Sequence, residues 1–207
     1  MRIGIDFDNT LACYDGVFHA AALERELIPR DLPSDKTSVR DYLRAEGQDP
    51  LFTELQGYVY GARMDLVAVY PGAFAALAAL KSAGHELAIV SHKTREPFAG
   101  PRYDLHAAAR GFLVAQRLAG PGGLIDDARV HFELTKEAKV ARAAALGCEV
   151  FIDDLPEILA MPGYPPGLRA ILFDPDGHYD GGRWKQHSFE RHRSWAEIGR
   201  ALGVGAA

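Results

Sequence analysis

The sequence predicts an α/β protein with a doubly wound parallel sheet and a small helical cap inserted after the first strand. Five short runs of residues are almost continuously apolar, as expected of strands that are covered on both faces. Segments with helical periodicity separate these runs, and this alternation is typical of a parallel sheet. Between Leu11 and Tyr70 only amphipathic segments occur, and this interruption predicts the cap.

Each predicted element is recognised by its apolar pattern and by the residues at its ends. Pro71 and Gly84 bracket one core helix, and Thr135 and Ser194 are the expected N-caps of two others. The polar run 190–193 is predicted to be a solvated turn. The expected strands are 3–7, 86–91, 129–133, 149–153 and 169–173; the expected core helices are 71–84, 103–120, 135–147 and 194–203; the expected loops are 120–123 and 162–167.

These elements divide the chain into a core and a cap. The core is expected to comprise residues 1–12 and 70–207, and the helical cap residues 13–69. In an open parallel sheet, ligands bind beyond the carboxyl ends of the strands, so a cap inserted after the first strand would lie over that edge.

Composition excludes several classes of protein. The 207-residue chain has a formal net charge of −5 without a basic stripe, which argues against a nucleic acid polymer as partner. Two cysteines, Cys13 and Cys148, make no disulfide framework, and neither a signal peptide nor an apolar run of membrane-spanning length is present. We therefore expect a cytoplasmic protein without membrane contact, and whether it forms a homodimer stays open.

Polar side chains gather where the predicted strands end. The first strand ends on two aspartates and the fourth on two more, while a serine, a histidine and a lysine follow the second. Two further lysines open the helix before the fourth strand. These residues are Asp6, Asp8, Ser91, His92, Lys93, Lys136, Lys139, Asp153 and Asp154.

Four neighbouring carboxylates repel one another, and a hard divalent cation relieves that repulsion. Mg²⁺ prefers oxygen ligands and is commonly bound by one or two carboxylates together with a substrate phosphate. A lysine and a serine then suit contacts to phosphate oxygens. One aspartate can act as a nucleophile and its neighbour can transfer protons.

Four motifs resemble those of the haloacid dehalogenase (HAD) superfamily. They are "DFDNTL" after the first strand, "IVSHK", the helix led by lysine, and "FIDDLPEIL". Their order and the helical insert after the first motif, a C1-type cap, are also similar to that superfamily. The resemblance implies a HAD-type Rossmann-like core that carries the catalytic residues. The layout is further similar to the 5′(3′)-deoxyribonucleotidase branch.

The resemblance assigns roles to the first motif. Asp6 would be the nucleophile that forms an aspartyl-phosphate, and Asp8 would be the general acid and base. Thr10 would support the turn and Asp8. True dehalogenases lack an acid/base aspartate at the position of Asp8, so its presence implies phosphoryl chemistry.

The other motifs supply binding residues. Ser91 would donate a hydrogen bond to a phosphoryl oxygen, while His92 and Lys93 would either contact substrate or lie in a solvated loop. Lys136 and Lys139 compete for the phosphate contact, and Lys136 is favoured because it lies in the first turn of its helix. The expected metal ligands are Asp6, Asp8 through its backbone carbonyl, Asp154 directly and Asp153 through water, an order that reverses if the alignment shifts by one residue.

The resulting hypothesis is a Mg²⁺-dependent phosphatase that cleaves a small phosphomonoester through an aspartyl-phosphate. A 5′-nucleotide is the first expected substrate. The alternatives are a phosphosugar or another small phosphorylated metabolite, or a non-catalytic protein that binds such a metabolite. A calcium loop is excluded because Leu11 occupies the position that requires glycine.

Overall fold

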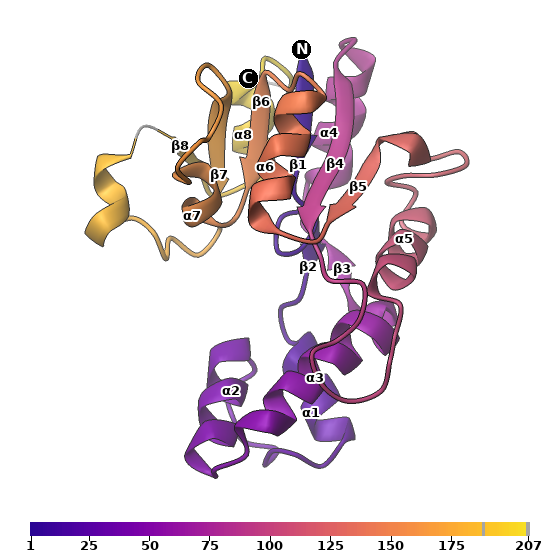
Figure 1. Cartoon of the computed structure of the whole chain (residues 1–207), viewed down its shortest axis with the longest axis vertical. Coiled ribbons are helices and arrows are strands. Elements are labelled where there is room, and N and C mark those ends of the chain that lie inside the picture. Colours follow the sequence, from indigo (N-terminus) through magenta and orange to yellow (C-terminus); the bar gives the residue numbers. More distant parts are fainter. Residues whose placement is uncertain (188, 206–207) are drawn as a thin grey trace.

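Six parallel strands form one sheet in the order β5-β4-β1-β6-β7-β8, which confirms the expected fold class (Figure 1). The computed structural model describes residues 1–187 and 189–205, without the side chains of residues 185 and 186. The strands are β1 (Arg2–Ile5), β4 (Glu86–His92), β5 (Val130–Glu133), β6 (Val150–Asp153), β7 (Arg169–Phe173) and β8 (Glu190–His192).

The sixth strand corrects the sequence analysis, because β8 occupies the run that was expected to be a solvated turn. Glu190 and His192 lie in parallel register with Ile171 and Phe173 of β7. The strand is at the edge of the sheet and half-buried, so its sequence lacks the apolar character by which central strands are recognised. A bidentate contact from Arg169 to Glu190 further fixes the two edge strands.

Helices cover both faces of the sheet. On one face α4 (Ala73–Ser82) and α8 (Trp195–Ala201) pack together over Ile3, Ile5 and Ile152. On the other face α6 (Lys136–Ala145) and α7 (Pro156–Leu159) pack over Val90 and Phe151 (Figure 1). The sheet is therefore apolar on both sides, as the continuous apolar runs predicted.

Two of the expected helix caps are confirmed. The Thr135 side chain accepts a hydrogen bond from the Ala138 amide at 3.1 Å, which fixes the start of α6. Ser194 accepts one from the Glu197 amide at 3.2 Å at the start of α8. The start of α6 matters for function because it places the lysine side chains of this helix at the carboxyl edge of the sheet.

Three helices between β1 and α4 form a separate layer beneath that edge (Figure 1). A two-stranded antiparallel ribbon, β2 (Ala12–Cys13) with β3 (Ala68–Val69), marks where the chain leaves the core and returns. The helices are α1 (Val17–Glu24), α2 (Lys36–Ala45) and α3 (Asp49–Ala62), followed by a 3₁₀ turn at Met64–Leu66. In the part of the chain that the structure describes, no helix is long and apolar enough to span a bilayer.

The segment after β4 connects the core with these helices. Gly57 and Gly61 on α3 face Pro97 and Tyr103, and a side chain at either glycine would collide with them. Further along, α5 (Leu105–Ala115) packs against α3. Short 3₁₀ helices at Asp127–Arg129 and Gly182–Gln186 complete the described elements.

A buried tryptophan fixes the loop that follows β1. Trp195 of α8 is fully buried, and its Nε1 donates a hydrogen bond to the Thr10 carbonyl at 3.0 Å. The carbonyl belongs to the loop that carries Asp6 and Asp8. The far end of the chain therefore holds this loop in place.

We expect Trp195→Phe to lower the free energy of unfolding by about 1–3 kcal/mol, because a buried carbonyl loses its donor and the smaller ring leaves a cavity. Urea denaturation followed by circular dichroism measures this loss. Trp184→Phe is the matched control, since Trp184 is only half-buried in a surface 3₁₀ helix. An equal loss in both variants would contradict the role assigned to Trp195.

Candidate active site

The loop after β1 aims two aspartates at the carboxyl edge of the sheet. The Phe7 carbonyl accepts hydrogen bonds from the amides of Leu11 and Ala12 at 3.0 and 2.9 Å, which closes a tight turn. Asn9 lies in the left-handed region with φ 54°, a conformation that asparagine tolerates better than most residues. The side chains of Asp6 and Asp8 leave this turn on either side of Phe7.

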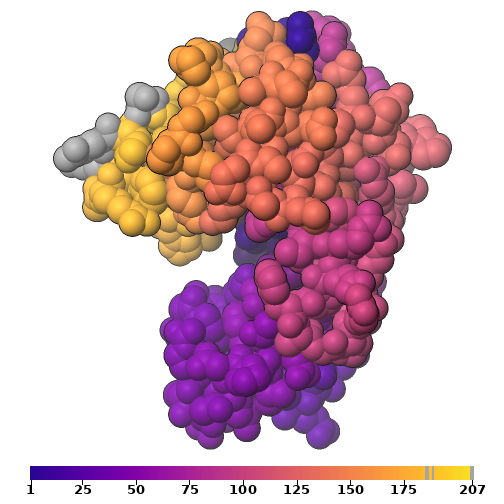
Figure 2. Space-filling view, in the orientation of Figure 1, coloured from indigo at the N-terminus to yellow at the C-terminus, as the bar shows by residue number. Residues whose placement is uncertain are grey.

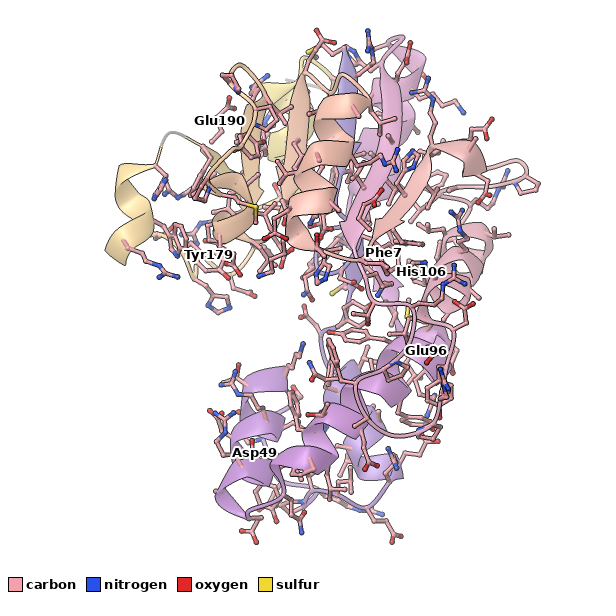
Figure 3. All side chains as sticks on the ribbon, in the orientation of Figure 1. Phe7, Asp49, Glu96, His106, Tyr179 and Glu190 are labelled. Carbon is pink, nitrogen blue, oxygen red and sulfur yellow. The ribbon has the colours of Figure 1, made fainter. Side chains whose placement is uncertain are left out.

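An aromatic cluster lies beneath the turn. The Phe7 ring packs edge-on against Phe112 and Phe132, with centroid distances of 5.7 and 5.8 Å. His106 packs against Phe132 at 5.3 Å, so residues of α5 and β5 support the same position (Figure 3). This apolar support excludes water from one side of the aspartates.

The Lys139 ammonium lies between two aspartates. Its Nζ is 2.7 Å from Asp6 Oδ1 and 2.6 Å from Asp153 Oδ2, and all three side chains are buried. Burial alone would lower the pKa of Lys139, but the carboxylates of Asp153 and Asp6 outweigh it and raise that pKa. Lys139 therefore remains a cation in the interior.

Lys136 lies apart from this group, contrary to the preference drawn from the sequence. Its Nζ is 3.2 Å from Glu157 Oε1, and both side chains are about two-fifths exposed. Lys139 is one turn further along α6 than Lys136, and its side chain reaches Asp6 after β1 and Asp153 at the end of β6. The geometry thus favours Lys139 for a role at Asp6.

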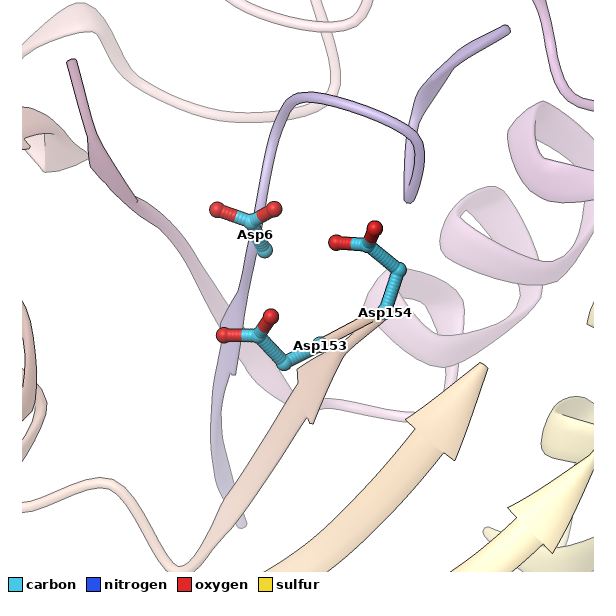
Figure 4. Close-up of side chains that lie close together, drawn as sticks. All are labelled: Asp6, Asp153 and Asp154. Carbon is cyan, nitrogen blue, oxygen red and sulfur yellow. The ribbon is translucent and has the colours of Figure 1, made fainter. Parts of the chain in front are cut away.

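Asp6, Asp153 and Asp154 converge on one point (Figure 4). One carboxylate oxygen from each lies within 4.8 Å of the others. Burial, opposed by Lys139, raises the pKa of Asp153 to about 7, and burial with repulsion from Asp6 raises the pKa of Asp154. One lysine does not neutralise three carboxylates, so repulsion among them adds to the effect of burial on both pKa values.

The donor set of this cluster fits Mg²⁺. All three side chains offer carboxylate oxygens, the ligand type that hard divalent cations prefer. Asp153 is already engaged, since Oδ1 accepts the Leu155 amide at 3.0 Å and Oδ2 contacts Lys139. Asp154 is more exposed than Asp153, which suits the direct ligand that the sequence analysis assigned to Asp154.

The Asp8 carboxylate lies outside the cluster and has a cation of its own. Lys93 Nζ is 2.8 Å from Asp8 Oδ2 and 3.1 Å from Oδ1, and the Lys93 side chain is buried. The Tyr14 hydroxyl donates a hydrogen bond to Asp8 Oδ1 at 2.6 Å. Asp6 and Asp8 are therefore kept apart by different partners, and only the backbone carbonyl of Asp8 remains a candidate for the metal.

The other expected residues take different places. Ser91 is buried on β4 in register with Phe132, and His92 ends β4, where burial lowers its pKa. The Thr10 hydroxyl faces Asp6 Oδ2 at 3.5 Å, a long contact, rather than Asp8 as expected. Lys93 is buried and contacts Asp8 in the loop after β1, so it is not a solvated residue.

Sequence reasoning missed two residues on the side of helices α1–α3, Tyr14 and Lys36, which both contact Tyr60 of α3. Lys36 Nζ donates a hydrogen bond to the Tyr60 hydroxyl at 3.0 Å and lies 4.4 Å from the centre of the Phe18 ring. Burial lowers the pKa of Lys36, while Asp8 and Asp154 oppose that shift. No motif marks Tyr14 or Lys36: Tyr14 precedes α1, and Lys36 opens α2, whose amphipathic pattern is generic.

A cleft separates the layer of helices α1–α3 from the sheet and its flanking helices (Figure 2). Its larger part has a volume of about 680 Å³, and an adjoining hollow of about 190 Å³ reaches Asp154. Asn9 and Asp15 line both parts, so the cleft continues from the carboxylate cluster to α2. The larger part is lined by Asn9, Tyr14, Asp15, Gly16, Ser34, Asp35, Lys36, Thr37, Asp176 and His178.

No protein-family model and no curated protein matches the sequence. Solved structures do match. A predicted phosphatase from Clostridium acetobutylicum aligns with a TM-score of 0.61 and 18% identity, covering 97% of this chain and 97% of that chain. The chain has the fold of HAD-superfamily hydrolases. A HAD-superfamily hydrolase of subfamily IA from Geobacter sulfurreducens aligns with a TM-score of 0.58 and 13% identity, covering 98% of this chain and 96% of that chain. A dehalogenase aligns with a TM-score of 0.59 and 14% identity, covering 99% of this chain and 97% of that chain.

The HAD fold accounts for the placement of the carboxylates. Asp6 follows β1 and Asp153 ends β6, and these strands are neighbours in the sheet. The Asp6 amide donates a hydrogen bond to the Ile152 carbonyl at 2.9 Å, which continues the pairing to the residue that bears the first carboxylate. Four motifs that are far apart in the sequence thus reach one edge.

We expect Asp154→Asn to raise the melting temperature of the metal-free protein at pH 8. A carboxyl whose pKa is raised by folding stabilises the folded state below its unfolded pKa and loses that contribution as the pH rises through the folded pKa. The advantage of the variant should therefore shrink as the pH falls toward 4. Differential scanning fluorimetry in EDTA, at a series of pH values, measures the difference in melting temperature between the variant and wild-type protein.

Asp176→Asn is the matched control, because Asp176 lines the cleft but is exposed and lies outside the carboxylate cluster. Mg²⁺ should stabilise wild-type protein and the Asp176→Asn variant more than the Asp154→Asn variant. A melting temperature that responds equally in all three would contradict a metal site at Asp154.

Proposed function

We propose that the chain is a Mg²⁺-dependent HAD-type phosphomonoesterase that works through an aspartyl-phosphate on Asp6. The observation that carries the proposal is the separation of Asp6 from Asp8. Asp6 lies in the carboxylate cluster with Lys139, while Asp8 lies outside it with Lys93 and Tyr14. Two neighbouring carboxylates in different environments suit two different roles, nucleophile and acid/base.

In the proposed reaction an Asp6 oxygen attacks phosphorus while the bond to the leaving-group oxygen breaks. Asp8 donates its proton to that oxygen, so an alcohol departs. Asp8 then takes a proton from a water molecule that attacks the aspartyl-phosphate, which regenerates Asp6 and releases phosphate. Lys139 holds Asp6 Oδ1 and so leaves Oδ2 as the attacking atom. Bound Mg²⁺ supplies charge neutralisation for the phosphoryl group.

Asp8 also favours a phosphatase over a dehalogenase, although both occur among the structures that share the fold. A dehalogenase needs no protonation of its halide leaving group, whereas an alkoxide does. The complete set of Asp6, Asp8, Lys139 and Asp154 likewise argues against a protein that binds a phosphometabolite without turnover.

The cleft supports a small organic phosphate as substrate. Its volume of about 680 Å³ lies in the range of small-molecule sites, roughly 300–1,000 Å³. A 5′-nucleotide is the first candidate and a phosphosugar the second; one structure with this fold is a predicted phosphoglycolate phosphatase from Haemophilus somnus. We further propose that residues 13–69 act as the cap over a core of residues 1–12 and 70–207, in a cytoplasmic enzyme.

We expect the protein to release phosphate from members of a panel of 5′-nucleotides and phosphosugars with Mg²⁺, and not with EDTA. Asp6→Asn should reduce kcat at least about a thousandfold, because the amide is no nucleophile. A malachite-green assay measures release, and circular dichroism checks the fold of the variant. Near-normal turnover by folded Asp6→Asn would refute the proposal.

The two α6 lysines are expected to differ. Lys139→Met should abolish turnover and destabilise the fold by about 3–5 kcal/mol, since it leaves buried carboxylates without their cation. Lys136→Met should reduce kcat less than about fivefold and cost at most about 1 kcal/mol, as for an exposed ion pair. Steady-state kinetics and urea denaturation compare the pair; the reverse ranking would restore Lys136 as the phosphate contact.

A further inference from the structure

The proposed acid, Asp8, is held by one residue from the core and one from the edge of the cap. Lys93 follows β4 and contacts both carboxylate oxygens, whereas the Tyr14 hydroxyl donates to Oδ1 alone. Oδ1 therefore accepts two hydrogen bonds, whereas Oδ2 has only the ion contact with Lys93. This asymmetry leaves Oδ2 as the oxygen that can carry a proton to a leaving group.

Tyr14 is built as a hydrogen-bond donor. Its side chain is 4% exposed, and burial, with the Asp8 carboxylate next in importance, raises its pKa well above the ordinary value. The phenol thus keeps its single proton. Besides Asp8, the acceptor recorded for this hydroxyl in the described chain is the weak Met64 Sδ at 3.7 Å. The direction of the proton is fixed toward Asp8.

Cap residues hold the Tyr14 ring. The ring packs edge-on against Tyr60 of α3 with a centroid distance of 5.1 Å, and against Phe18 of α1 at 6.3 Å. Phe18 and Tyr60 also contact each other at 5.7 Å. The position of the Tyr14 hydroxyl therefore depends on how α1 and α3 pack.

We propose that Tyr14 is a positioning residue that aims the Asp8 carboxyl at the leaving-group oxygen and makes proton donation depend on the packing of the cap. The inference rests on the proposed function. In the step concerned, the proton on Asp8 Oδ2 passes to the leaving oxygen, which keeps the electron pair of the broken P–O bond. Tyr14 keeps its own proton and the hydrogen bond to Oδ1 throughout.

The test compares Tyr14→Phe with wild-type protein on two substrates. The leaving group of an alkyl phosphate needs a proton, whereas p-nitrophenyl phosphate releases p-nitrophenolate, which is stable without one. We expect kcat/KM for the alkyl phosphate to fall about tenfold or more, the effect of losing a hydrogen bond to a charged group. This constant reports the formation of the aspartyl-phosphate, so the later role of Asp8 in hydrolysis does not enter it. For p-nitrophenyl phosphate, kcat/KM should stay within about twofold.

Tyr58→Phe is the matched control, because the Tyr58 hydroxyl also donates to a carboxylate, Glu24 Oε1 at 3.0 Å, on the exposed side of α3. It should leave the ratio of the two kcat/KM values unchanged. Phe18→Leu is the second variant, because it keeps the Tyr14 hydroxyl but loosens the support of the Tyr14 ring. It should lower kcat/KM for the alkyl phosphate selectively, and less than Tyr14→Phe does.

Equal losses on both substrates, or no loss on the alkyl phosphate with folded Tyr14→Phe, would overturn the inference. An unselective effect of Phe18→Leu would overturn the dependence on the cap. These outcomes are distinct from failure of the proposed function, in which wild-type protein releases no phosphate from either substrate in the presence of Mg²⁺.

Discussion

The ion contacts of Lys139 with Asp6 and Asp153 are the constraint on which the site depends. They join α6, the loop after β1 and the end of β6 through one buried ammonium. Burying a cation or a carboxylate costs free energy unless the charge is paired. Each of the three groups therefore requires the other two. The same arrangement leaves one carboxylate, Asp154, in excess, and that excess negative charge is what makes a divalent cation suitable.

A second consequence is that the opening pair of aspartates is divided between two charge systems. Asp6 belongs to the Lys139 cluster, and Asp8 belongs to Lys93 and Tyr14. The repulsion between Asp6 and Asp8 is thus offset by two cations from different elements, Lys139 of α6 and Lys93 at the end of β4. Distinct environments for two carboxylates are the usual physical basis for assigning them distinct acid and base roles.

Much of the fold could be predicted because its signals are local. Continuous apolar runs located the central strands, and Thr135 and Ser194 marked helix starts by their side-chain chemistry. The strand β8 was not predicted, because an edge strand lacks that apolar signal. In the site, the aspartates at strand ends were accessible to sequence reasoning, whereas the choice between Lys136 and Lys139 depends on the crossing of α6 over the sheet. Tyr14 depends on the packing of aromatic rings, which no spacing records.

Helices α2 and α3 and the loop after β1 also share their contacts, and this sharing limits how either part can change. The Lys93 ammonium contacts Asp8 and lies 4.9 Å from the centre of the Tyr60 ring, while the Tyr60 hydroxyl accepts a hydrogen bond from Lys36. A displacement of α3 therefore alters the surroundings of both lysines at once. Lys36 lines the cleft, and Lys93 holds the proposed acid, Asp8. Tyr60 of α3 contacts both lysines, so α3 would support substrate recognition and the chemistry alike. Under the proposed function, a substitution that reshapes the surroundings of Tyr60 would therefore change recognition and turnover together.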